Sequence, residues 1–266
     1  MDPLLITALL LVATAFAACA GLLIALLGLQ RVFSIAPCLE AAPELDPADT
    51  SLCVVIPAYN EVDNIGPCLA SVLASDTPCR DWQVLVVDDD STDLTTETAM
   101  RTATESNAAE RPFELLRAGP RPAGERWVGK NWACTRAMEQ VRSHWVLFID
   151  ADVRLQPEAL RRALAQAIRE EADLFSLAPR LGCGCLAEWM VQPIMASLLG
   201  LGFPIEATND PASEVAFAAG PFMLFRRSAY EAIGGHRALA SEVVEDLALA
   251  RGIKGGGFRL RYLLGL

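Results

Sequence analysis

Two short stretches decide the fold of this chain: LCVVIPAYNE at residues 52–61 and QVLVVDDDSTD at residues 83–93. Each begins with a run of apolar, mostly β-branched residues, which is typical of a strand buried inside a sheet. Each run then gives way abruptly to polar residues, mostly carboxylates. Between the two stretches, residues 62–75 carry apolar side chains at helical spacing. The order strand, helix, strand predicts a crossover between two parallel strands.

The same alternation continues along the chain. We expect strands at residues 52–57, 83–87, 113–117, 145–149 and 258–263, and helices at residues 62–75, 92–107, 130–141 and 157–170. Such alternation builds a mostly parallel sheet with helices on both faces, so the predicted fold class is α/β. Ligands of such sheets bind beyond the carboxyl ends of the strands.

An apolar segment precedes this domain. Residues 4–29 carry no charge and are numerous enough to cross the roughly 30 Å hydrocarbon layer as a helix. The only charge before them is Asp2 and no good cleavage site follows, which favours a signal anchor over a cleaved signal peptide. Because Arg31 follows at once, the positive-inside rule places the rest of the chain in the cytoplasm, held by a single pass in the cell (inner) membrane. A buried hydrophobic hairpin of a soluble protein is the alternative.

Two further segments need an interpretation. Residues 36–51 combine proline, acidic and small residues without apolar periodicity, so we expect a transmembrane anchor over 1–31 and a linker over 32–51. Residues 186–203 are apolar and uncharged after Glu188, but they are short for a membrane span. Three interpretations stay open for 186–203: a helix against the bilayer surface, the lining of an apolar pocket, or an ordinary buried helix.

Composition excludes several classes of protein. The chain has 266 residues, of which 53% are hydrophobic and 21% charged, which is too apolar for a disordered protein. Its 33 Asp and Glu against 22 Lys and Arg give a net charge of −11, which argues against a nucleic acid partner because such a partner requires a basic face. The eight cysteines are scattered, so we expect reduced thiols, and Cys183 with Cys185 lacks a second pair for zinc.

Polar clusters follow three of the predicted strands: residues 59–61, 88–93 and 150–152. Because the carboxyl ends of parallel strands meet at one edge, these carboxylates would repel one another unless a cation or a donor-rich ligand lies among them. Helix capping explains any single cluster equally well. Together, the three clusters predict a binding site.

The last of these clusters suggests a metal. Asp150 and Asp152 are two residues apart, so in an extended strand end both side chains leave the same face and can hold one divalent ion, Mg²⁺ or Mn²⁺. Such sites complete their coordination with water and substrate phosphates, which points to a nucleotide diphosphate. His144 and His236 form no metal set with these acids and are expected to be structural or exposed.

Six motifs, in this order, resemble the family 2 glycosyltransferases of the GT-A fold, which use nucleotide-activated sugars. The motifs are VVIPAYNE at 54–61, VVDDDSTD at 86–93, GKNWA at 129–133, FIDAD at 148–152, AAGPFMLFRR at 218–227 and VEDLALA at 244–250. The resemblance covers residues 52–262. The stretch 127–133, with the later Asn209-Asp210-Pro211, is most similar to membrane-associated members linked with hopanoid and carotenoid biosynthesis.

The resemblance implies roles for the matching residues. It assigns the nucleotide-sugar pocket to Ala58, Tyr59, Glu61, Asp89, Lys130 and Asp150, and the metal to Asp152 together with Asp150. Asp89 would accept a hydrogen bond from the base, and Lys130 would add positive charge near the phosphates. The alternative for Lys130 is a solvated surface lysine.

The resemblance also implies the catalytic residue. Asp246 matches the general base that takes the proton of an attacking hydroxyl, while the diphosphate leaves from the opposite side of the sugar. We expect its neighbour Glu245, on the acceptor side, to serve mainly the start of a helix. Gly220 and Pro221 would shape the floor of the acceptor site.

The function that these residues imply is that of an inverting, metal-dependent glycosyltransferase. It would move a sugar from a nucleotide-diphosphate sugar to a hydroxyl of a lipid-like acceptor at the cytoplasmic membrane face. Its catalytic domain, 52–266, would divide into a nucleotide-sugar half, about 52–152, and an acceptor half, about 153–266. No Gln-x-x-Arg-Trp motif follows Asp246, which argues against processive polysaccharide synthesis, and the end at Leu266 suggests a chain truncated before further membrane helices.

Two other functions stay open. A nucleotidyltransferase that makes activated sugars would also bind nucleotide and metal on an α/β sheet, but it needs a basic loop for a triphosphate, and none precedes Asp88. An inactive membrane-tethered assembly subunit would keep the fold, and the intact acids argue against it.

Overall fold

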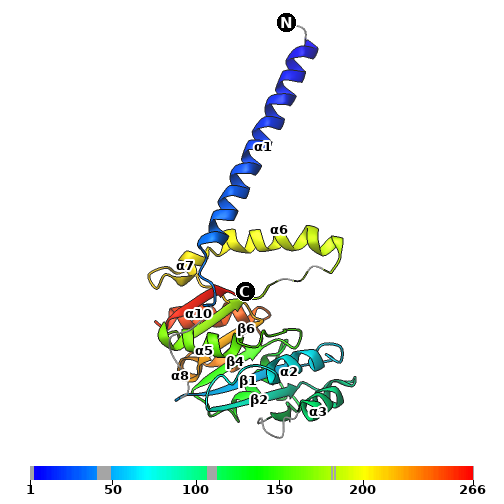
Figure 1. Cartoon of the computed structure of the whole chain (residues 1–266), viewed down its shortest axis with the longest axis vertical. Coiled ribbons are helices and arrows are strands. Elements are labelled where there is room, and N and C mark those ends of the chain that lie inside the picture. Colours follow the sequence, from blue (N-terminus) through cyan, green and yellow to red (C-terminus); the bar gives the residue numbers. More distant parts are fainter. Residues whose placement is uncertain (1–2, 41–48, 107–112, 181, 183, 266) are drawn as a thin grey trace.

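The computed structural model shows a long helix that projects from a globular α/β domain (Figure 1). It describes the whole chain except residues 1–2, 41–48, 107–112, 181, 183 and 266, so much of the predicted linker lies outside the described residues. The long helix, α1, spans Pro3–Ile35 and continues past the predicted end of the anchor at residue 31. Its residues Pro3–Ile24 are long and apolar enough to cross a membrane, and none of them is buried. The alternative of a buried hairpin is therefore wrong.

Seven strands form one mixed sheet in the order β3-β2-β1-β4-β6-β5-β7. The strands are β1 Ser51–Ala58, β2 Asp81–Asp88, β3 Phe113–Arg117, β4 Trp145–Ile149, β5 Leu174–Ala178, β6 Phe222–Arg226 and β7 Leu260–Leu264. Among them, only β6 runs antiparallel to its neighbours, β4 and β5. The predicted mostly parallel α/β sheet is confirmed.

Helices cover both faces of the sheet, as the sequence predicts. Successive residues of β1 point to opposite faces, so Val54 and Ile56 pack on one side while Cys53 and Val55 pack on the other. The first side is covered by α2 Ile65–Leu73, α3 Thr95–Glu105 and α5 Ala159–Arg169, and the second by α4 Asn131–Met138, α8 Arg227–Ala232, α9 Gly235–Ala238 and α10 Glu245–Gly255. The helices predicted at α2, α4 and α5 are each shorter than expected at both ends, and the predicted end of α3 lies outside the described residues.

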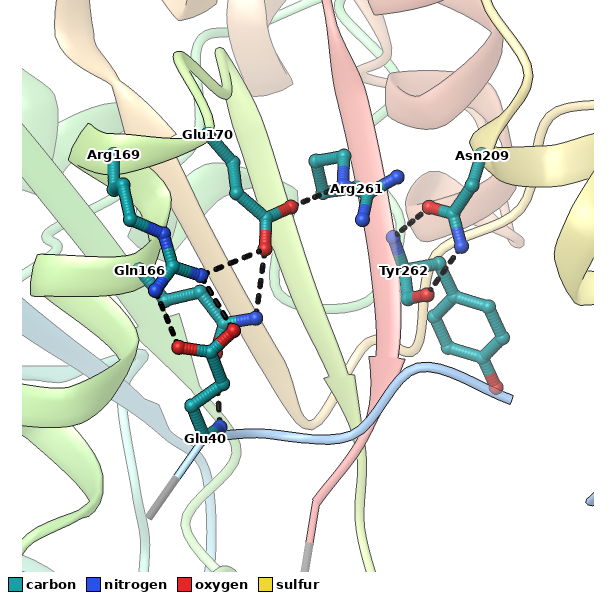
Figure 2. A network of polar contacts seen from close by, with 7 residues as sticks. All are labelled: Glu40, Gln166, Arg169, Glu170, Asn209, Arg261 and Tyr262. Atoms are coloured by element: carbon teal, nitrogen blue, oxygen red, sulfur yellow. Dashed lines mark hydrogen bonds and ion pairs between the residues drawn. The ribbon is translucent and has the colours of Figure 1, made fainter. Parts of the chain in front are cut away.

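Residues 36–40 are not the free tether that their composition predicts. Leu39 is buried, and its backbone N–H donates to the carbonyl of Leu264 in β7 at 3.0 Å. The carboxylate of Glu40 forms an ion pair with Arg169 of α5 (Figure 2). The chain is therefore fastened to the sheet and to α5 directly after α1 ends.

Two helices lie between β5 and β6 in the chain, α6 Leu186–Gly202 and α7 Ile205–Asn209. No side chain of α6 is buried. An ordinary buried helix, one of the three interpretations of this segment, is therefore wrong. Figure 1 shows α6 lying crosswise at the foot of α1, between α1 and the sheet.

Candidate active site

A cavity of about 740 Å³ opens where β1, β2 and β4 end, at the carboxyl edge of the sheet. Seven of the residues singled out in the sequence line it: Ala58, Tyr59, Glu61, Asp89, Lys130, Asp150 and Asp152. Seven further lining residues complete it: Pro57, Asp90, Thr92, Arg121, Gly129, Ala133 and Ala151. The three polar clusters therefore meet in one place.

The loops after β1 and β2 are bound to each other. The backbone N–H of Asn60 donates to the Ser91 hydroxyl at 3.0 Å, and the Asn60 side-chain oxygen accepts from the N–H of Thr92 at 2.8 Å. Asn60 and Asp90 both have positive φ, 55° and 68°, a conformation that Asn and Asp tolerate better than most residues. Asp93 accepts from the N–H of Thr95 at 2.9 Å at the start of α3, so the capping explanation holds for this one acid.

Asp89 is a nearly buried carboxylate on the cavity wall, with 8% of its side chain exposed. Its partner is Arg121, whose guanidinium Nη2 lies 2.6 Å from Oδ2 of Asp89. Burial raises the pKa of Asp89; Arg121 opposes that rise, whereas the neighbouring Asp88 and Asp90 add to it. Sequence reasoning missed Arg121, because nothing in the local sequence pattern pairs it with an acid 32 positions earlier.

Lys130 joins the cavity to α10. Its ammonium pairs with the carboxylate of Asp150 and lies 3.3 Å from Oε1 of Glu245, and 24% of the side chain is exposed. Burial acts to lower the pKa of Lys130, but the two carboxylates together raise it above its ordinary value. The alternative of a solvated surface lysine is therefore wrong. Glu245 does more than begin a helix, because its carboxylate pairs with the same lysine as Asp150, the residue directly after β4.

Asp150 and Asp152 do not leave an extended strand end as predicted. The strand β4 ends at Ile149, and a turn follows, closed by the N–H of Val153 on the carbonyl of Asp150 at 3.1 Å. Both acids nevertheless line the cavity, and within the described part of the chain no hydrogen bond or ion pair engages the carboxylate of Asp152.

Asp246 is the second residue of α10 and is half-buried. A Cβ atom added to Gly220 would lie 3.2 Å from its Oδ2, so the backbone before β6 passes directly against this carboxylate. Glycine therefore leaves room that any side chain would restrict. Neither Asp246 nor Glu245, Gly220 or Pro221 lines the cavity itself; Glu245 connects this group to it through Lys130.

Comparison with known protein families decides the assignment. The model of Glycosyl transferase family 2 matches residues 53–234, more than half of the chain. The chain belongs to this family. The resemblance seen in the sequence motifs is confirmed, and the chain is a glycosyltransferase by family.

Among curated proteins, this glycosyltransferase is similar to the 4,4'-diaponeurosporenoate glycosyltransferases of Staphylococcus aureus. It is 28% identical to that of strain bovine RF122 / ET3-1 and 27% identical to that of strain USA300, over 202 residues in each case. The matched part is 75% of this chain and 50% of each relative. The chain therefore spans about half the length of these relatives.

Solved structures show the same fold. Mannosyltransferase PcManGT from Pyrobaculum calidifontis, in complex with GDP-Man and Mn²⁺, superposes with a TM-score of 0.63 at 21% identity, covering 96% of this chain and 66% of that one. TarS 1-349 of S. aureus superposes with a TM-score of 0.53 at 19% identity, and the match covers 80% of this chain and 58% of that one. These likenesses confirm the GT-A fold.

Proposed function

We propose that this glycosyltransferase moves a sugar from a nucleotide-diphosphate sugar to a hydroxyl of a lipid-like acceptor at the cytoplasmic face of the membrane, with inversion at the sugar. One observation carries the proposal. Acids and an aromatic from three strand ends converge in a single cavity, and Lys130 connects that cavity to the helix that begins with Glu245 and Asp246.

The cavity suits a nucleotide sugar by size and by chemistry. Its volume of about 740 Å³ is in the range of small-molecule sites. Tyr59 keeps 58% of its surface exposed at the cavity and can pack on the face of a base. Asp89, held by Arg121, offers an acceptor for an imide or amide N–H of that base. The complex of PcManGT with GDP-Man supports this use of the fold.

The residues present fit a divalent metal bound together with a diphosphate. The described residues contain no group of three or more His, Cys, Asp or Glu side chains that could hold a metal by themselves. Mg²⁺ and Mn²⁺ sites at phosphates commonly use only one or two carboxylates, and Asp152 with Asp150 would supply them here. Such a metal would neutralise charge on the leaving diphosphate. Lys130, now paired with Asp150, provides a fixed positive charge on the same wall.

Asp246 is proposed as the general base. A hydroxyl must lose its proton as it attacks the anomeric carbon, and a carboxylate on the acceptor side can take that proton. A donor whose diphosphate binds in the cavity would leave its anomeric carbon open to attack from the Asp246 side, and such an attack, opposite to the leaving diphosphate, would invert the configuration. Gly220 keeps the approach to this carboxylate open.

A membrane-bound acceptor is proposed from α1 and from the relatives. A helix long enough to span a bilayer leads directly into the domain, so an acceptor in the bilayer would lie close to the catalytic edge. The names of the curated relatives contain a diaponeurosporenoate, and the suffix denotes a carboxylate. The relatives' name thus suggests an acid acceptor, whereas we propose a hydroxyl. A carboxylate is already ionised at neutral pH and needs no general base, so only a hydroxyl acceptor gives Asp246 a proton to accept.

The test is transfer from labelled UDP-sugars and GDP-sugars by the full chain in lipid vesicles. Two acceptors are compared, a long-chain polyisoprenoid alcohol and the acid of the same chain length, each with Mn²⁺ and with EDTA. We expect label in the alcohol only, and only with metal. Label in the acid alone would overturn the hydroxyl acceptor, and equal transfer in EDTA would overturn the metal. Pyrophosphate release from nucleoside triphosphate and a sugar phosphate would instead indicate a nucleotidyltransferase.

A further inference from the structure

The helix α6 exposes apolar side chains on every side. Trp189, Met190, Val191 and Leu199, which follow one another around the helix axis, keep 68%, 64%, 55% and 45% of their surface exposed. No charged residue occurs between Glu188 and Glu206. A helix that is apolar all round is normally buried in a protein core or in a membrane, and no side chain of α6 is buried in this chain. The apolar surface of α6 therefore lacks, among the described residues, the apolar contacts that such a helix normally makes.

The position of α6 relative to α1 suggests what that environment is. Figure 1 shows α6 crosswise to α1, at the level where α1 meets the domain. If α1 crosses a bilayer, α6 lies in the plane of its surface. With 17 residues α6 is about 25 Å long, too short to cross the hydrocarbon layer, and Pro193 interrupts it.

Both helices are fastened to the same strand, β7. On the α1 side, the N–H of Leu264 donates to the carbonyl of Pro37 at 2.9 Å, and Leu39 donates back to Leu264 at 3.0 Å. On the other side, Asn209, at the end of α7, pairs with both backbone groups of Tyr262 at 2.7 and 2.8 Å (Figure 2). The segments that follow α1 and α6 in the chain are thus both bound to residues 262–264 of one strand.

Aromatic packing fixes the end of α6 as well. Phe203, directly after α6, stacks on Phe217 with ring centroids 4.9 Å apart, and Phe217 meets the Tyr262 ring edge-on at 5.1 Å. Lys254 of α10 donates to four backbone carbonyls between residues 207 and 215 at 2.6–3.0 Å. The segment that follows α6 is therefore held to the rest of the domain by both aromatic packing and hydrogen bonds.

We infer that α6 is a second membrane contact, embedded at the boundary between headgroups and acyl chains of the bilayer that α1 crosses. It fixes the tilt of the domain and the height of the cavity above lipid-borne acceptors. The inference rests on the proposed function in one respect, that α1 spans a membrane. A lipid surface is favoured over a second copy of the chain because α6 lies crosswise at the foot of α1, at the level where a bilayer crossed by α1 would end.

Thiol-attached probes test this in the full chain. Leu198→Cys on α6, with 58% exposure, is compared with Met100→Cys on α3, with 49% exposure. The accessible cysteines Cys19, Cys38 and Cys185, together with Cys183, are first replaced by serine. The remaining four are buried; burial raises the pKa of Cys53 and Cys68 to about 12 and of Cys79 to about 11, and it raises that of Cys134 further, so these thiols react slowly.

The labelled chains are reconstituted in vesicles of phosphatidylcholine and phosphatidylglycerol. For the probe at Leu198→Cys we expect emission at shorter wavelength and several-fold stronger quenching by lipids that carry a spin label near the headgroup, compared with Met100→Cys. Met195→Cys, one turn away, gives a second reading if Leu198→Cys folds poorly. Equal, water-like emission at both helices would overturn the inference. Short-wavelength emission without lipid quenching would also overturn it, because a second copy of the chain would then cover α6.

A separate measurement keeps the two proposals apart. Resistance of the chain to extraction by alkaline carbonate reports on α1 alone. A chain that resists extraction but has a water-exposed α6 contradicts only this inference. A chain that is extracted contradicts the membrane anchor of the proposed function, and this inference with it.

Discussion

At the scale of single residues, the candidate site is built from charges paired across long stretches of sequence. Arg121 holds Asp89, and Lys130 holds both Asp150 and Glu245. The acids were visible in the sequence because each follows an apolar strand. Lys130 was also named from the sequence, but its pairing with Asp150 and Glu245 was not, and Arg121 was missed altogether, because these pairs form only in the folded domain.

The Arg121–Asp89 pair gives a first prediction. Replacing Arg121 with Gln removes the group that opposes the raised pKa of Asp89, so this carboxylate protonates at a higher pH and stops accepting a hydrogen bond from the base. Donor affinity in Arg121→Gln should fall by about 10- to 150-fold, since a charged hydrogen bond contributes about 1.5–3 kcal/mol, and should weaken further as the pH is lowered. Calorimetric titration between pH 7.5 and 5 measures both effects.

The matched control is Arg80→Gln. Arg80 is exposed and lies next to the amino end of β2, at the opposite edge of the sheet from the cavity. The Arg80→Gln substitution should leave the donor affinity and the pH dependence of that affinity unchanged. If both variants behave alike, Arg121 does not support the nucleotide site.

At the scale of elements, prediction from sequence succeeded where strands alternate with helical patterns and failed in the part of the sheet around β5 and β6. The strands β1, β2 and β4 were expected, and their ends define the cavity. β5 has five residues, as β4 has, but it was missed because LFSLA contains a polar serine and stands between an acid and a loop. The residues of β6 lie within the motif quoted at 218–227, but their antiparallel pairing with β4 and β5 has no local signal.

The same limit applies to the turn after β4 and to α6. Residue spacing cannot tell that the chain turns directly after Ile149, so the reason given for pairing Asp150 with Asp152 was wrong although both reach one cavity. The composition of residues 186–203 suits a core helix and a membrane helix equally. Only the three-dimensional structure shows that α6 contributes nothing to the core.

The packing of α9 on β4 gives a second prediction. His236 is buried against Phe148, and its Nδ1 lies 2.7 Å from the hydroxyl of Tyr230. Burial, with Lys130 adding to it, lowers the pKa of His236 from 6.5 to about 3. Below pH 6.5, His236 therefore binds a proton in the unfolded chain but stays neutral in the folded chain until the pH approaches 3. This contribution to stability is complete above pH 6.5 and is lost as the pH falls toward 3, at up to about 1.4 kcal/mol per pH unit.

Thermal unfolding of His236→Gln and wild type at pH 7 and pH 5.5 measures this effect. We expect the wild-type unfolding temperature to fall more between the two conditions than that of His236→Gln. His144→Gln, at the exposed histidine, controls for the loss of a histidine as such. A pH dependence that is identical in wild type and His236→Gln would contradict the assignment of a neutral, buried His236.

At the scale of the whole molecule, the short joint between α1 and the sheet brings the domain close to any membrane that α1 crosses. Residues 36–40 are bonded to β7 and α5, so the domain cannot swing freely. We predict that it lies on the cytoplasmic side. Protease added to right-side-out vesicles should leave the domain intact, whereas protease added to inside-out vesicles should digest it. Digestion in right-side-out vesicles would place the domain outside and away from the cytoplasmic supply of nucleotide sugar.

The central claim is that Asp246 accepts the proton of the acceptor in a site whose donor pocket is built separately. The measurement is the transfer rate to the lipid acceptor at saturating donor, with donor affinity, for Asp246→Asn, Asp152→Asn and the exposed control Asp76→Asn. Loss of a general base costs about 10² to 10⁴ in rate. For Asp246→Asn we predict a loss of transfer rate of this size with unchanged donor affinity. For Asp152→Asn we predict weaker donor binding, and for Asp76→Asn wild-type rate and affinity. Near wild-type turnover in Asp246→Asn, or a greater loss in Glu245→Gln, would contradict the account.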